Sequence, residues 1–164
     1  MSSNCIISET SKCDFENILL LWNNGEVMSF VGFPDGLGMK IEKMDEWLAW
    51  AINHPSRCHY SIYNDDIGYC GETFYSVDAE TGTSSLDIKL LPIAQGKGIA
   101  QTALVFAINK AFNIGMAERV YVDPHPDNYK ALALYNKLGF ISKPRPKYLE
   151  YYDTYLEISK EEWE

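Results

Sequence analysis

The chain has 164 residues, of which 46% are apolar and 23% charged, and its formal net charge is −9. This length suits one domain with a single core, and the sequence has no apolar run long enough for a membrane helix. The negative charge argues against general nucleic-acid binding, which needs Lys and Arg to neutralise phosphates. It is compatible with a cationic substrate.

The N-terminus and the cysteines predict where the protein works. No basic segment followed by an apolar stretch occurs after Met1, so we expect no export signal and a cytoplasmic location. Cys5, Cys13, Cys58 and Cys70 form no CxxC pair and have no zinc-type spacing with histidine. We therefore expect free thiols and no metal.

The first third of the chain predicts a strand over residues 4–9 and two amphipathic helices, over 15–22 and 44–51. Each helix has apolar residues at the i, i+3, i+4, i+7 spacing, and Gly25 is expected to end the first of them. Between them, residues 25–40 read GEVMSFVGFPDGLGMK, with four glycines and a proline. This segment is either the wall of a pocket or a packed connection.

The middle of the chain changes to a period of two. Residues 58–63, 67–77 and 84–91 predict three strands, joined by Asn/Asp-rich and Gly-containing turns. We expect an antiparallel meander. On its last strand one face carries Leu86, Ile88 and Leu90, and the other carries Ser85, Asp87 and Lys89.

The last third predicts a helix after Pro92, a strand over residues 118–122 and a second helix. That second helix is expected to begin at Asp127 as its N-cap and to end at Gly139. Strand-like stretches follow at residues 140–141 and 148–158. The order of elements indicates one mixed α/β domain.

The stretch LPIAQGKGIAQTAL places two glycines where a strand gives way to a helix. A P-loop would need Ser or Thr at Gly98, and a dinucleotide fingerprint would need glycine at Gln101, so both motifs are excluded. The remaining hypothesis is a pyrophosphate held by N–H groups of the first helical turn. The alternative is a glycine-rich turn that binds nothing.

Two motifs resemble those of the GNAT superfamily of N-acetyltransferases. Residues 95–100 match Q/R-x-x-G-x-G/A, preceded by Pro92, and residues 128–140 match Asn-x-x-Ala-x-x-x-Tyr-x-x-x-Gly-Phe. The resemblance implies a single GNAT domain over residues 1–164. Its fold would be a central mixed, mostly antiparallel sheet of about seven strands with about four helices, splayed at an acetyl-CoA cleft.

The same resemblance implies roles for individual residues. Backbone groups of one strand would pair with the pantetheine arm, loop N–H groups would hold the pyrophosphate, and Tyr135 would be the general acid. Asn128 would contact the cofactor near its pantetheine part. Two residues before Asn128, Pro126 and Asp127, are extra relative to the tightest form of the motif, so the match at Asn128 is weaker than the match at Tyr135. The cofactor-binding residues so implied are Ile88, Leu90, Gln95, Gly96, Lys97, Gly98, Ile99, Ala100 and Asn128.

The general base is a separate hypothesis. Glu72 alternates with Cys70 and Phe74, so burial on a partly apolar strand face is expected to raise its pKa toward that of a useful base. Asp87 is the competitor, and a water or backbone carbonyl could serve instead. Either carboxylate could also be a solvent-facing strand residue.

The resemblance thus implies an acyltransferase that moves the acetyl group of acetyl-CoA directly to a primary amine, in a small cationic molecule or a protein, through a ternary complex. The acceptor is expected between residues 25–40 and the C-terminal strands. A non-catalytic acyl-CoA-binding sensor or partner-binding module is the alternative, and a longer acyl group is a further one. Neither a nucleic-acid partner nor a membrane is expected; homodimers are common in the family, but nothing here fixes the oligomeric state.

Overall fold

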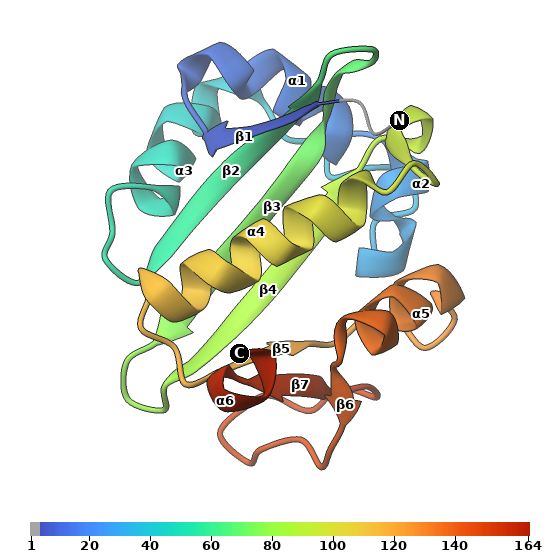
Figure 1. Ribbon diagram of the computed structural model, residues 1–164. Helices are drawn as coiled ribbons and strands as arrows, with labels where there is room; N and C mark the ends of the chain where they lie inside the picture. Colours follow the sequence, from blue (N-terminus) through green and yellow to red (C-terminus); the bar gives the residue numbers. More distant parts are fainter. Residues whose placement is uncertain (1–3) are drawn as a thin grey trace.

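A mixed sheet of seven strands runs through the computed structural model, which describes residues 4–164 (Figure 1). Its strand order is β1-β2-β3-β4-β5-β7-β6. Within residues 4–164, only β4 and β5 pair in parallel; the other strand pairings there are antiparallel. The strands are β1 (Cys5–Glu9), β2 (Arg57–Asn64), β3 (Gly68–Asp78), β4 (Thr83–Leu90), β5 (Arg119–Val122), β6 (Ile141–Ser142) and β7 (Leu156–Ser159).

Helices cover both faces of this sheet. One face packs against α1 (Phe15–Trp22) and α3 (Met44–Ala51), and the other packs against α4 (Ile99–Asn113). The remaining helices are α2 (Gly25–Met28), α5 (Tyr129–Leu138) and α6 (Lys160–Trp163), with short 3₁₀ turns between them. In Figure 1, α4 crosses β3 and β4 on the near side, while α1 and α3 lie behind. The predicted fold class is confirmed.

The meander β2–β3–β4 forms as its alternating pattern predicts. Leu86 lies in the core beneath α4, while Asp87 and Lys89 line a pocket on the opposite face. Their registers place Glu72 of β3 opposite Lys89, and Phe74 opposite Asp87. Because directly opposed residues share a face, these four side chains gather in one place.

The sheet splays after the first residues of β4. In the described part of the chain, β5 pairs with β4 at three positions, Thr83 with Arg119 through Ser85 with Tyr121. Figure 1 shows β5, β7 and β6 turning away from the rest of β4. The second half of β4 therefore has a backbone edge that β5 does not cover.

Three local expectations need correction. Asn128, not Asp127, caps α5, because its Oδ1 accepts a hydrogen bond from the N–H of Ala131 at 3.3 Å. Gly25 begins the short helix α2 and does not end α1, which stops at Trp22. Residues 148–155 form no strand, since the segment before them contains two prolines that cannot donate to a ladder.

All four cysteines have free thiols, and Cys58 and Cys70 are buried. Within residues 4–164 there is no group of three or more His, Cys, Asp or Glu side chains that could hold a metal ion. Nor does any helix in that range combine the length and the apolar character needed to cross a membrane.

Candidate active site

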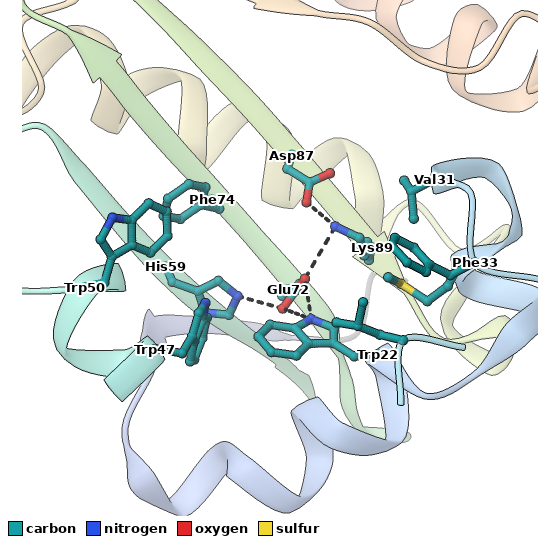
Figure 2. A pocket seen from close by; sticks show the side chains of 12 residues that line it. Trp22, Val31, Phe33, Trp47, Trp50, His59, Glu72, Phe74, Asp87 and Lys89 are labelled. Atoms are coloured by element: carbon teal, nitrogen blue, oxygen red, sulfur yellow. Dashed lines mark hydrogen bonds and ion pairs between the residues drawn. The ribbon is translucent and has the colours of Figure 1, made fainter. Parts of the chain in front are cut away.

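A pocket of about 330 Å³ opens on the face of the sheet that carries α1 and α3 (Figure 2). Residues 25–40 form one wall, so that segment is a pocket wall and not merely a packed connection. The floor is made by β2, β3 and β4. The lining residues are Trp22, Met28, Val31, Phe33, Leu37, Trp47, Trp50, His59, Glu72, Phe74, Asp87 and Lys89.

The carboxylate of Glu72 lies at the centre of the polar groups, as Figure 2 shows. Trp22 donates its indole N–H to both carboxylate oxygens at 2.9 Å, and His59 Nε2 lies 2.6 Å from Oε2. The ammonium of Lys89 is 3.6 Å from Oε1. Glu72 is only 3% exposed. It is therefore buried but surrounded by donors.

These donors decide the ionisation of Glu72. Burial alone raises the pKa of the carboxyl, but the opposing effects of His59, Lys89 and the Trp22 N–H outweigh it and hold the pKa below its usual value. The predicted rise in the pKa of Glu72 is therefore wrong. The sequence placed Glu72 on a buried face correctly but could not show which partners it meets there.

His59 extends this network into the interior. Its Nδ1 lies 2.6 Å from Thr10 Oγ1, which lies 2.8 Å from Ser61 Oγ, and all three side chains are buried. The ring of Trp47 meets the His59 ring edge-on at 4.7 Å between centroids. His59 is therefore fixed at both nitrogens and on one face.

Lys89 brings a positive charge into the pocket from β4. Its ammonium contacts the carboxylate of Asp87 and faces Glu72. Burial by itself lowers the pKa of Lys89, but the two carboxylates raise it further than burial lowers it, so Lys89 stays charged. Asp87 is the more accessible of the two acids, with 46% of its side chain exposed, against 4% for Glu72.

The open edge of β4 exposes the backbone of Ile88 and Leu90. Thr73 Oγ1 donates to the carbonyl of Asp87, and Leu91 N–H donates to Cys70 of β3, so the odd-numbered residues face β3. Backbone groups alternate sides along a strand, which turns those of Ile88 and Leu90 toward the splay. Gln95 Nε2 donates to the Leu90 carbonyl at 3.2 Å and so joins the loop to this edge.

The glycine loop next to this edge has the backbone shape of an anion cradle. Gly96 and Gly98 have φ of +73° and +80°, a region that residues with a Cβ rarely adopt. A Cβ at either position would meet no atom within 4 Å, so the loop's outer side is open. Gly98 is the N-cap of α4, and the N–H groups of Ile99 and Ala100 belong to its first turn. The loop therefore fits a pyrophosphate group.

Tyr135 on α5 is 6% exposed and packs edge-on against Phe140. Burial raises the pKa of its phenol, and the negative charges of Asp87 and Asp123 raise it further. Tyr135 therefore keeps its proton well above neutral pH. Asn128, by contrast, already uses its side-chain oxygen to cap α5.

The structure brings together residues that sequence reasoning did not single out. Trp22, Trp47, His59 and Lys89 come from four elements, and no short motif joins them. The expected contribution of the C-terminal strands to the pocket is not found among its lining residues. Tyr148, for example, lies instead 2.9 Å from the hydroxyl of Thr83.

Comparison with solved structures supports the fold. The spermidine N-acetyltransferase from Vibrio cholerae, in complex with CoA and spermine, aligns with a TM-score of 0.81 and 18% identity over 97% of each chain. A chimera of that enzyme with hSSAT aligns with a TM-score of 0.79 and 16% identity over 98% of each chain. No protein with a curated description matches the sequence.

Family membership rests on the sequence itself. The family model described as an acetyltransferase (GNAT) domain matches residues 5–141, which is most of the chain. The seven-stranded splayed sheet agrees with that match. The chain therefore belongs to the GNAT acetyltransferase family and is an acyltransferase.

Proposed function

We propose that this protein transfers the acetyl group of acetyl-CoA directly to a primary amine within a ternary complex. The observation that carries the proposal is the arrangement of β4. Ile88 turns its backbone toward the splay, while its neighbours Asp87 and Lys89 place their side chains in the pocket. A cofactor bound along the open edge of β4 would therefore meet an acceptor bound in the pocket, in the second half of this strand.

In this proposal the cofactor lies along the open edge of β4. Ile88 and Leu90 offer backbone groups to the pantetheine arm, and the loop of residues 95–100 receives the pyrophosphate. The Vibrio cholerae structure that this chain resembles contains CoA, which supports the assignment. Asn128 would reach the cofactor through its amide nitrogen.

The chemistry needs two proton movements. The amine nitrogen, once neutral, forms a bond to the thioester carbonyl carbon, the carbon–sulfur bond breaks, and the leaving sulfur takes a proton from Tyr135. Because its pKa is raised, Tyr135 remains an acid at the pH where amines react. We assign Glu72 the binding of the incoming ammonium, and Asp87 with solvent the removal of its proton, because the Asp87 side chain is 46% exposed to water and that of Glu72 only 4%.

The acceptor in this proposal is a small cationic amine. The acidic surface and the buried carboxylate of Glu72 attract a cation, and the similar solved structures are of spermidine N-acetyltransferase. A non-catalytic acyl-CoA sensor would need the glycine loop but would have no use for a buried, protonated Tyr135.

The test combines calorimetric titration with acetyl-CoA and thiol release in the presence of primary amines. We expect saturable binding and amine-dependent release. Tyr135→Phe should lower kcat by about a hundredfold, the low end for loss of a general acid, and leave acetyl-CoA affinity within about twofold.

Tyr129→Phe is the matched control, because Tyr129 begins the same helix and is 74% exposed. It should keep the kcat of the unsubstituted protein. Binding without release for every amine would support the sensor, and absence of acetyl-CoA binding would refute the proposal.

A further inference from the structure

The acceptor pocket has more apolar and aromatic surface than a binding site for a linear polycation needs. Trp22 and Trp47 meet edge-on at 4.8 Å between ring centroids, and Trp50 lies 5.7 Å from Phe74. Phe33 stands at the mouth with 44% of its surface exposed. Exposed large apolar side chains gathered at a pocket mouth indicate contact with an apolar ligand.

The charge inside the pocket is small because Lys89 supplies an internal cation. Two carboxylates, Glu72 and Asp87, and one ammonium leave one net negative charge, and none if His59 is protonated. Lys89 contacts both acids, so it competes with any ligand for them. The pocket can therefore balance one ammonium group and not several.

The aromatic rings of the pocket do not provide a binding site for a second cation either. The guanidinium of Arg57 already covers the ring of Trp50, with Cζ 4.4 Å from its centroid. A second ligand ammonium at that wall would lose its hydration and meet a positive charge there. At about 330 Å³, the pocket is also near the lower end of the size range of small-molecule sites.

We infer that the acceptor is a monoamine with an aromatic or bulky apolar body, that is, of the arylalkylamine class. This inference rests on the proposed function and narrows its substrate. The ammonium group points to Glu72 of β3 and Asp87 of β4, and the apolar body lies against Phe33 and the tryptophans. The polyamine class, although it appears in the similar solved structures, does not suit this pocket.

The first experiment compares kcat/KM for 2-phenylethylamine, ethylamine and spermidine by thiol release at fixed, saturating acetyl-CoA. We expect 2-phenylethylamine to exceed each of the other two by at least about tenfold. Equal or higher kcat/KM for spermidine overturns the inference and leaves the proposed function standing. No release with any of the three or with any other primary amine, despite bound acetyl-CoA, overturns the proposed function itself.

Two variants locate the selectivity in the pocket. Phe33→Ala should lower kcat/KM for 2-phenylethylamine by about tenfold through lost apolar contact and leave ethylamine within about twofold. Lys89→Met removes the internal cation and should raise the ratio of spermidine to 2-phenylethylamine by about tenfold. An unchanged ratio in Lys89→Met that still binds acetyl-CoA contradicts the charge argument.

Lys12→Met is the control for Lys89→Met, because Lys12 pairs with Asp45 on the surface, where both side chains are at least 70% exposed. It should leave the substrate ratio unchanged. The measurement on the unsubstituted protein decides the inference even if the Lys89 variant fails to fold.

Discussion

Glu72 shows how two opposing physical effects act on one residue. Its burial favours the neutral acid, while His59, Lys89 and the Trp22 N–H favour the anion, and the anion prevails. A buried charge held by several partners in this way is costly to leave without them. The contacts that hold Glu72 as an anion therefore also link the folding free energy to pH.

Glu72→Gln tests this link. The pKa of Glu72 is lower in the folded than in the unfolded protein. Ionisation of Glu72 therefore stabilises the fold at pH values above 4.5, the ordinary pKa of this carboxyl. That stabilisation is lost as the pH falls through the folded-state pKa. We expect Glu72→Gln to lower the free energy of unfolding by about 1–3 kcal/mol at neutral pH. The difference should shrink as the pH falls below 4.5.

Urea unfolding at a series of pH values measures both proteins. Glu80→Gln, a change at an exposed turn, serves as the control and should follow the unsubstituted protein throughout. A difference between Glu72→Gln and the parent that stays constant down to acid pH would mean that the Glu72 carboxyl is not stabilised as an anion.

For single residues, the sequence predicted which strand face a side chain occupies better than it predicted which residues that side chain contacts. Alternation placed Glu72 and Lys89 on strand faces, and motif resemblance singled out Tyr135, which is buried and feels the negative charges of Asp87 and Asp123. The contacts of Glu72 with Trp22 and His59 join residues 50 and 13 positions apart. Such contacts depend on strand register and helix docking, which periodicity does not specify.

Among the elements, the loop that leads into α4 is the one on which the proposed acetyl-CoA site depends. Gly98→Glu puts a side chain in a left-handed conformation, at φ +80°, and adds a negative charge at the start of the helix. We expect acetyl-CoA affinity to fall at least about a hundredfold, or about 2.7 kcal/mol, because the charge would repel the pyrophosphate.

Gly68→Glu controls for strain and charge. Gly68, the first residue of β3, has a φ of +85°, with open space around a Cβ. The two variants should lose similar stability, yet Gly68→Glu should bind acetyl-CoA as the parent does in calorimetry. Equal affinities for all three proteins would remove the pyrophosphate from this loop.

The elements also show where local sequence signals suffice. The period of two and the polar turns predicted β2, β3 and β4 to within one residue at each end, although β2 and β3 are buried on both faces of the sheet. The apolar, aromatic-rich stretch at residues 148–155 looked equally strand-like, but pairing there needs a partner edge, and the preceding prolines deny it one. Burial patterns predict strands well, whereas pairing depends on the rest of the sheet.

For the whole molecule, we expect a ligand bound in the splay to stabilise the C-terminal part. β4 and β5 share three paired positions, so β5 and the following α5 are joined to the rest of the sheet by few backbone hydrogen bonds. Acetyl-CoA bound along the open edge would contact both β4 and α5. Ligand at about one hundred times its Kd adds about 2.7 kcal/mol to the free energy of unfolding.

Hydrogen exchange followed by mass spectrometry can locate this gain. Segments that open locally report their own opening free energy, so a ligand that joins two parts should slow exchange most in the part that opens most easily. We expect acetyl-CoA to slow exchange in α5 and β5 more than in β1 and β2. Gly98→Glu at the same ligand concentration should show no such difference. If α5 and β5 exchange equally fast with and without acetyl-CoA in the parent protein, the cofactor does not bridge the splay, and Tyr135 cannot be the acid that serves its sulfur.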